Sequence, residues 1–179
     1  MSNTKFRKDN SIKSKSQAKY DAQGNMIIVE TYDLNNQLIS IHQSEYDKNG
    51  NELILTRTDK VRDKVWLTKK TYDNHNQMIE KIEYSPDGSI RDKRTFVFDE
   101  KGNEIELILT RPNGDYTKFI SKYDKFNNMT VQYWYEEDGT QKHKTSFEYM
   151  YDENNNWITR RRFSNDELGM VWERIIEYY

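Results

Sequence analysis

The chain of 179 residues contains no cysteine, only two prolines and no long hydrophobic run. The absence of cysteine excludes disulfide bonds, thiolate metal sites and a thiol nucleophile. No segment is apolar enough for a membrane-spanning helix, and the first residues lack the apolar stretch of a signal peptide. We therefore expect no membrane insertion. The chain is either cytoplasmic, or extracellular and at the cell surface if an export signal has been removed, and the sequence does not separate these locations.

A strong excess of one charge is also lacking. Lys and Arg number 28 against 30 Asp and Glu, the net charge is −2, and the two signs are interspersed. Because a nucleic-acid surface needs a basic field, we expect no nucleic-acid partner. The one basic cluster, Arg160 to Arg162, lies between Glu153 and Asp166 and is typical of a solvated strand.

A short phrase that begins with an aromatic residue recurs through the chain. Its clear copies are YDAQGNMI, YDLNNQLI, YDKNGNEL, YDNHNQMI, FDEKGNEI, YDKFNNMT and YDENNNWI, which begin at Tyr20, Tyr32, Tyr46, Tyr72, Phe98, Tyr123 and Tyr151. Looser copies begin at Phe6, Thr58, Tyr84, Thr110, Tyr135 and Phe163. Most starts are 12 or 14 residues apart, so two copies make a period of about 26 residues, which indicates a repeat architecture.

The conserved spacing within each copy describes a tight turn. Counting the aromatic as position zero, position four is Gly or Asn in 11 of the 13 copies, and these residues tolerate positive φ best. Both prolines, Pro86 and Pro112, occupy position two, and Asp is commonest at position one. This pattern predicts a type I turn closed by a left-handed residue in a three-residue hairpin loop. Residues 58–71 and 166–169 depart from it, so we expect a longer loop or a bulge at each.

About seven or eight β-prone residues separate successive turns, which is an ordinary strand length. The sequence therefore predicts an all-β protein, an antiparallel up-and-down meander of about 14 strands built from repeats of about 26 residues. We expect a curled single sheet, because open sheets of that width twist or fold over; a sandwich or a closed barrel is the alternative. The even spacing also predicts that the repeat aromatics project from one common face.

The repeat boundaries suggest the organisation of the chain. We expect residues 1–19 to form an N-terminal partial repeat or cap, residues 20–162 the array of hairpins, and residues 163–179 a capping C-terminal strand, all within a single domain. The apolar segment Val171 to Tyr179 could pair with another chain, so a homodimer through an edge strand is a further expectation.

The phrase Tyr-Asp-x-x-Gly-Asn-x-Ile resembles the YD repeats of the Rhs/YD family and the related MORN-like tyrosine-rich repeats of bacterial proteins. The resemblance covers roughly residues 20–163. It implies a bacterial, non-enzymatic β-repeat scaffold that contacts another protein or lies at the cell surface. The family's terminating aspartyl cleavage signature and appended toxin are missing from this chain, so neither enclosure nor autoproteolysis is expected. The recurring residues are turn formers, and the family supplies no catalytic residue.

No motif with a chemical function stands out beside the repeats. His42, His75 and His143 lack metal-ligand spacing, the acidic turns do not match a calcium loop, and no nucleotide or hydrolase signature is present. We expect no enzyme activity, no metal and no cofactor; a small hydrolase built on paired carboxylates is the least favoured alternative. The candidate ligand-binding residues are Tyr133, Trp134 and Tyr135, the densest aromatic run.

These observations favour an interaction module that binds a protein partner along the face or edge of its sheet. A carbohydrate-binding or cell-surface adhesion module, in which aromatic side chains stack on a glycan, is the alternative.

Overall fold

The computed structural model describes residues 2–6 and 12–178, with side chains from residue 14 onward. The regular elements of these residues are strands: β1 (Ser2–Phe6), β2 (Ile12–Tyr20), β3 (Met26–Tyr32), β4 (Leu38–Tyr46), β5 (Glu52–Asp59), β6 (Lys64–Tyr72), β7 (Met78–Tyr84), β8 (Ile90–Phe98), β9 (Glu104–Thr110), β10 (Tyr116–Tyr123), β11 (Met129–Glu136), β12 (Gln141–Tyr151), β13 (Trp157–Ser164) and β14 (Glu167–Glu173). None of the described segments forms a helix with the length and apolar character that crossing a bilayer requires.

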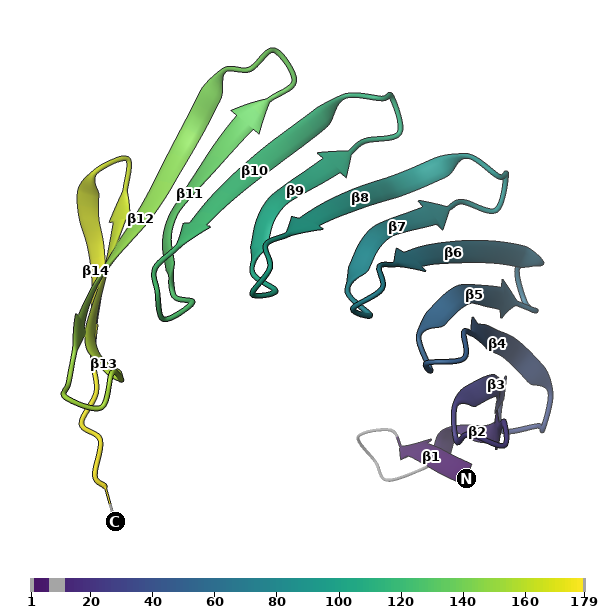
Figure 1. Cartoon of the computed structure of the whole chain (residues 1–179). Coiled ribbons are helices and arrows are strands. Elements are labelled where there is room, and N and C mark those ends of the chain that lie inside the picture. The colour runs from purple at the N-terminus through teal and green to yellow at the C-terminus, as the bar shows by residue number, and fades with distance from the viewer. Residues whose placement is uncertain (1, 7–11, 179) are drawn as a thin grey trace. The chain divides into compact units, whose positions relative to one another are not determined.

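The 14 strands form one sheet in which they follow each other in chain order, from β1 to β14 (Figure 1). Neighbouring strands are antiparallel and the sheet does not close, so the up-and-down meander is confirmed and the barrel is excluded. A sandwich is excluded too, because all the strands belong to the same sheet.

Backbone contacts divide the chain into two compact units, unit 1 (Met1–Lys93) and unit 2 (Arg94–Tyr179), whose boundary falls inside β8. The expected division into a cap at 1–19, an array at 20–162 and a cap at 163–179 stays a prediction. Residues 1 and 7–11 of the first segment and residue 179 of the last lie outside the described residues.

The turns have the predicted geometry. In the first of them the amide of Asp21 donates to the carbonyl of Asn25 at 2.9 Å, and the amide of Gly24 donates to the carbonyl of Asp21 at 3.2 Å. Gly24 has a φ of 88°. The other position-four residues with positive φ are Gly50, Gly88, Gly102, Gly114, Gly139, Asn36, Asn76, Asn127 and Asn155. Left-handed residues therefore close the three-residue loops at both ends of the strands.

Where position one is aspartate, its carboxylate binds the backbone amides of the turn. One carboxylate oxygen of Asp47 accepts from the amides of Asn49 and Asn51 at 2.8 and 2.9 Å, and the other accepts from the Asn51 side chain at 2.9 Å. The hydrogen bond from the Asn51 side chain is the largest cause of the lowered pKa of Asp47. Equivalent Asp bonds to the amides at positions three and five recur at Asp21, Asp33, Asp73, Asp99, Asp124 and Asp152.

The two segments that depart from the repeat differ from the other turns as expected, each in its own way. Asp59 pairs with Lys64, which leaves a longer loop of residues 60–63, and here Asp63, not Arg62, has positive φ. Ser164 pairs with Glu167 around Asn165 and Asp166, both with positive φ, so this loop is shorter than the repeat turn, and Gly169 is skipped by the pairing as a bulge.

A bulge beside most of the repeat turns overturns the prediction that the aromatics share a face. Lys19 pairs with Ile28 and Tyr20 with Met26, so Ile27 has no partner, and the same skip recurs beside six further repeat turns. The turn that begins at Thr110 has no such skip, since Thr110 pairs with Tyr116 and Leu109 with Thr117. Side chains alternate between the two faces along a strand, so one extra residue moves all the following side chains to the other face. Tyr20 therefore faces one side of the sheet and Tyr32 the other.

The repeat aromatics alternate between faces with the same rhythm as the turns alternate between ends. Within each unit we name the side that carries the following residues the tyrosine face: Tyr46 and Tyr72 in unit 1, and Tyr123 and Tyr149 in unit 2. The other side is the opposite face, which carries Tyr32, Tyr84 and Tyr135.

Tyrosines of the tyrosine face tie one hairpin to the next at the same end of the sheet. The hydroxyls of Tyr46 and Tyr72 donate to the backbone carbonyls of Met26 and Glu52, at 3.0 and 3.1 Å. In unit 2, Tyr123 and Tyr149 donate in the same way to Glu104 and Met129, both at 2.9 Å. Each acceptor lies at position six of the hairpin one period earlier, so these bonds fasten the repeats across two strands.

Near the C-terminus, two further tyrosine hydroxyls bind an earlier hairpin, here through side chains of its turn. The hydroxyl of Tyr151 contacts Asp124, and this contact, added to burial, raises the pKa of Tyr151 to about 12. Tyr178 donates to Asp152 at 2.5 Å and accepts from the Asn156 side chain at 2.7 Å, so the tail beyond β14 binds the 152–156 turn.

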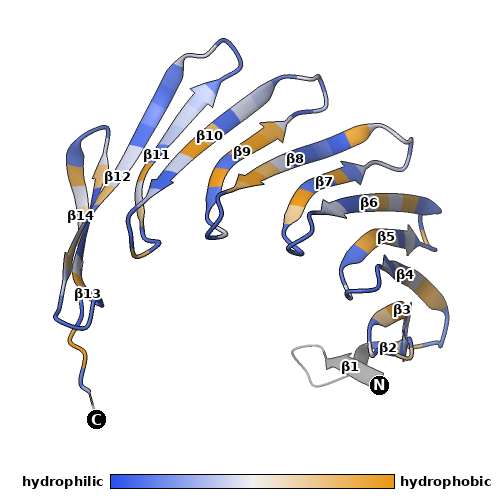
Figure 2. Ribbon diagram, in the orientation of Figure 1, coloured by the Kyte–Doolittle hydropathy of each residue, from blue (hydrophilic) through white to orange (hydrophobic). Residues whose placement is uncertain are grey.

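Both faces of the sheet remain partly open. Among residues 14–178 no hydrophobic side chain is fully buried, and the buried residues are Thr68, Thr117 and Ser121. Figure 2 shows hydrophobic and hydrophilic segments within the same strands, with hydrophilic turns. Aliphatic and aromatic side chains are thus half-buried against their cross-strand neighbours, which is the packing of a single layer.

We predict that Tyr123→Phe lowers the free energy of unfolding by about 1 kcal/mol, because it removes a hydrogen bond and keeps the ring. Chemical denaturation followed by circular dichroism measures the change. Tyr135→Phe in the same unit is the control, since the Tyr135 hydroxyl has no hydrogen bond to the described residues. Equal losses for the two variants would contradict a fastening role of the Tyr123 hydroxyl.

Candidate functional site

The aromatic run singled out from the sequence does not form one surface. Trp134 lies on the tyrosine face of unit 2, where its ring is 6.1 Å from that of Phe119 and 37% of the residue is exposed. Tyr133 and Tyr135 lie on the opposite face with their rings 6.2 Å apart. Ligand binding by these three residues stays a prediction, and a single flat ligand can contact only Trp134 or the two tyrosines.

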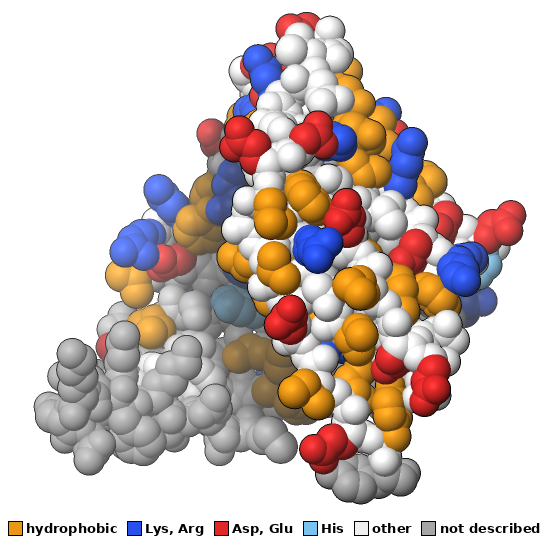
Figure 3. All heavy atoms as spheres, turned by 90° about the vertical axis from the view of Figure 1, so that its left-hand side faces the viewer, with side chains coloured by type: hydrophobic (Ala, Val, Ile, Leu, Met, Phe, Trp, Pro, Cys, Tyr) orange, Lys and Arg blue, Asp and Glu red, His pale blue; other side chains and the backbone are white. Residues whose placement is uncertain are grey.

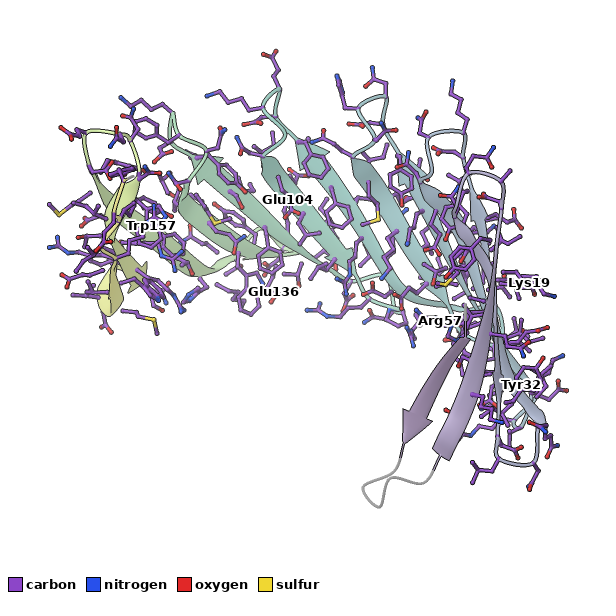
Figure 4. All side chains as sticks on the ribbon, turned by 90° about the horizontal axis from the view of Figure 1, so that it is seen from below. Lys19, Tyr32, Arg57, Glu104, Glu136 and Trp157 are labelled. Atoms are coloured by element: carbon purple, nitrogen blue, oxygen red, sulfur yellow. The ribbon has the colours of Figure 1, made fainter. Side chains whose placement is uncertain are left out.

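A second aromatic cluster surrounds Arg160 on the tyrosine face of unit 2. The Arg160 guanidinium lies 3.9 Å from the Trp172 ring centre and 5.4 Å from that of Trp157, which Figure 4 labels on β13. Its Nε is buried and has no hydrogen-bond partner among the described residues. The sequence predicted that residues 160–162 form a solvated strand. Arg161 and Arg162 are exposed, as that prediction requires. The prediction is wrong for Arg160, whose side chain is half-buried because Trp172 and Trp157 cover it.

A hollow lies in unit 1, on its tyrosine face. Its volume is about 570 Å³, which is within the range of small-ligand sites. Strands β4 to β7 and the 60–63 loop form its walls, together with Arg91 of β8. The lining residues that carry charge or an aromatic ring include His42, Arg57, Arg62, Trp66, Glu83 and Arg91.

Cross-strand pairing brings the centre of this hollow together. Arg57 on β5 pairs with His42 of β4 on one side and with Trp66 of β6 on the other, so the three side chains stand in a row. In Figure 4, Arg57 projects from the sheet on the side away from Lys19 and Tyr32, which belong to the opposite face. Burial, and then the nearby Arg57 charge, lower the pKa of His42, so this imidazole is neutral at pH 7.

Two of the three arginines in the hollow are already paired. Arg62 binds Asp59 at 2.9 Å, and Arg91 contacts Glu83, which also binds Lys81. The hydrogen bonds from Lys81 and Arg91 lower the pKa of Glu83 to about 2. Arg57 is exposed and has neither an ion pair nor a side-chain hydrogen bond with a described residue. The hollow therefore contains one guanidinium without an ion pair to a described residue, that of Arg57, between the His42 imidazole and the Trp66 indole.

The chemistry available here is anion binding. Nothing in the described part of the chain groups three or more His, Asp or Glu side chains in a way that could hold a metal ion. The three histidines lie apart, His42 on β4, His75 in the 73–77 turn and His143 on β12.

Sequence reasoning missed this hollow. His42, Arg57 and Trp66 are 15 and 9 residues apart, and no motif joins them. The available signal was the departure of residues 58–71 from the repeat. That departure produces the longer 60–63 loop, which contributes Val61 and Arg62 to the wall.

Comparison with known proteins informs the fold alone. No family model matches the chain, and no curated protein matches it. The solved structure described as TcdB2-TccC3-Cdc42 matches with a TM-score of 0.59 and 14% identity over 93% of this chain and 9% of that chain. The structure of TcdB2-TccC3 matches with a TM-score of 0.60 and 13% identity over 94% and 10%. A porin-like protein from Bacteroides uniformis ATCC 8492 has a TM-score of 0.41, too low to carry an argument.

The chain spans about a tenth of the length of the two TcdB2-TccC3 chains that it matches. At these identities the likeness concerns the architecture of the sheet alone.

We predict that Glu83→Gln lowers the free energy of unfolding by about 1–2 kcal/mol at pH 7, because it breaks a pair of charge-assisted hydrogen bonds. The folded-state pKa of Glu83 is lowered, so its contribution is complete above pH 4.5 and is lost as the pH falls toward about 2. Urea denaturation of both proteins from pH 7 to pH 2 should show the difference disappearing in that window. Glu80→Gln, which removes one ion pair to Lys93 at 2.8 Å, is the control and should have the smaller effect at pH 7. A Glu83→Gln difference that stays constant down to pH 2 would contradict the assignment.

Proposed function

We propose that the chain is a non-catalytic β-repeat scaffold that binds a protein partner on its tyrosine face. The observation that carries this proposal is the state of the sheet: among residues 14–178 no hydrophobic side chain is fully buried. Antiparallel sheets normally cover at least one face with a second layer. A partner that packs on the sheet would supply that layer.

The tyrosine face is the better candidate of the two. In unit 2 it combines the rings of Phe119 and Trp134 with the cluster of Trp157, Arg160 and Trp172. Tryptophan, tyrosine and arginine are the side chains that most often dominate protein interfaces. In unit 1 the tyrosine face of that unit holds the hollow around Arg57.

The use of the recurring polar residues supports a non-catalytic role. The repeated aspartates cap turn amides, and the repeated tyrosines donate to backbone carbonyls of a neighbouring hairpin. In these copies the side chains therefore have structural partners. The resemblance to Rhs/YD repeats and the match to TcdB2-TccC3 are in keeping with a β-repeat scaffold.

A second copy of the chain is another partner to consider, through the edge of the sheet. β14 is the outermost strand, and Leu168, Met170 and Val171 on it are exposed. Figure 3, which views the side where β12 to β14 lie in Figure 1, shows hydrophobic side chains dispersed among charges of both signs. An unprotected edge of this kind can pair with another strand, so an edge-paired homodimer is the second form of the proposal.

A glycan is the alternative ligand, and Trp134 is the residue that favours it. Its partly exposed ring, stacked beside Phe119, offers an apolar surface on which a sugar ring can lie.

Site-specific photo-cross-linking in the source cells tests the proposal. We predict that a photoreactive phenylalanine analogue at Trp134, on the tyrosine face, gives a discrete adduct with one protein partner. The same analogue at Met150 is the matched control, because Met150 is exposed on the opposite face of the same unit. An adduct with the chain itself would support the homodimer.

Two outcomes would contradict binding of a protein on this face. One is an adduct of equal yield from both positions. The other is the absence of any adduct together with glycan-array binding that Trp134→Ala abolishes, which would favour the carbohydrate-binding alternative.

A further inference from the structure

We propose that the hollow on the tyrosine face of unit 1 is a carboxylate-binding site, and that Arg57 anchors there an acidic side chain of a bound peptide segment. The proposal rests on the partner-binding function above and deepens it by naming the chemistry that one part of the face recognises.

The first argument is the uncommitted charge of Arg57. The other two arginines of the hollow are paired with Asp59 and Glu83, whereas the Arg57 guanidinium makes no ion pair with a described residue. The acidic group whose charge it affects, Glu52, is bound by Lys70 and Ser44. A guanidinium presents two parallel N–H donors that match the two oxygens of a carboxylate. An incoming carboxylate would therefore complete a pair that the chain itself leaves unmade.

The second argument is the rigidity of the anchor's surroundings. Arg57 stands between His42 and Trp66 in the sheet register, and the buried Thr68 lies on the same face one step along β6. Strands hold their side chains in a more defined geometry than loops do, which reduces the entropy lost on binding.

The third argument is the charge balance, which selects a singly charged anion. Arg57, Arg62 and Arg91 contribute three positive charges to the lining, and Asp59 and Glu83 contribute two negative charges. The lowered pKa of Glu83 keeps that carboxylate ionised, and His42 is neutral at pH 7. One net positive charge is neutralised by a singly charged carboxylate, whereas a phosphate dianion would leave a net negative charge beside the two acidic groups.

The fourth argument concerns what surrounds the carboxylate. Trp66, Ile39 and Val61 also line the hollow, and Val61 is 72% exposed in the 60–63 loop. His42 and Arg57 are both exposed, so these apolar groups border a site that is open to solvent. An acidic residue flanked by aliphatic residues fits this combination better than a free anion does.

The test uses the full chain, labelled with ¹⁵N, and the peptide acetyl-Val-Glu-Val-amide as the probe. NMR titration should shift the signals of the Arg57 side chain, the Trp66 indole and the His42 ring. The matched peptide acetyl-Val-Gln-Val-amide, which lacks the charge, should leave them unchanged. Inorganic phosphate is titrated separately.

We predict that Arg57→Gln weakens binding of the acidic peptide by about tenfold or more, which is the loss of a charged hydrogen-bonded pair. Arg57→Lys keeps the charge but not the planar fork, so it should bind with intermediate affinity. Arg161→Gln is the control, because Arg161 is exposed on the opposite face of unit 2, where it lies 3.8 Å from Glu148. Retention of the dispersed NMR spectrum shows that each variant is folded.

The carboxylate assignment is overturned if the peptide does not bind, if the Gln peptide binds equally well, or if Arg57→Gln leaves the affinity unchanged. Tighter Arg57-dependent binding of phosphate than of the acidic peptide would also overturn it. The cross-linking at Trp134 separates this failure from that of the proposed function, because Trp134 lies in the other unit. A Trp134 adduct without peptide binding removes the Arg57 site alone.

Discussion

The local constraint on which the structure depends is the closure of the repeat turns by a left-handed residue, and in most of these turns an aspartate also caps the backbone amides. Gly50 takes positive φ, and Asp47 accepts from the amides of Asn49 and Asn51, so the direction and register of the next strand are set by residues close in sequence. Contacts of short range can therefore specify a wide sheet. A chain with few hydrophobic residues needs such local instructions, because it has little apolar surface with which to choose among alternative pairings.

The second level of organisation is the fastening of hairpins across two strands. The hydroxyl of Tyr72 reaches the carbonyl of Glu52, and Tyr123 reaches Glu104, so each tyrosine satisfies an acceptor that lies one period back. In a single layer these bonds and the half-buried cross-strand pairs replace part of what a closed core provides elsewhere. The same openness leaves polar and aromatic side chains, such as Arg57 and Trp134, available to a second molecule.

Features that depend on a few neighbouring residues were predicted correctly from the sequence. Features that depend on the pairing register of several strands were not. Position four of the repeat identified the left-handed residues correctly, from Gly24 to Asn155, because positive φ strongly restricts residue choice. The common face of the aromatics was wrong, because the bulge at residues such as Ile27 has no sequence signature and yet shifts every later side chain by one. The hollow was missed for a related reason: His42, Arg57 and Trp66 meet only through register, and register is a property of three strands together.

The alternation of the repeat aromatics between the two faces also governs how such an array can grow. Within a unit, each turn lies at the other end of the sheet from the turn before it, and its aromatic lies on the other face. One turn is therefore related to the next by a rotation of half a turn about the direction in which the strands succeed each other, combined with a shift of one strand. A chain with this screw symmetry that gained or lost a single strand would carry every downstream side chain to the reverse side. Whole pairs of strands restore the original orientation. The length of a functional array can therefore change in even steps only, and its binding surface is inherited two strands at a time.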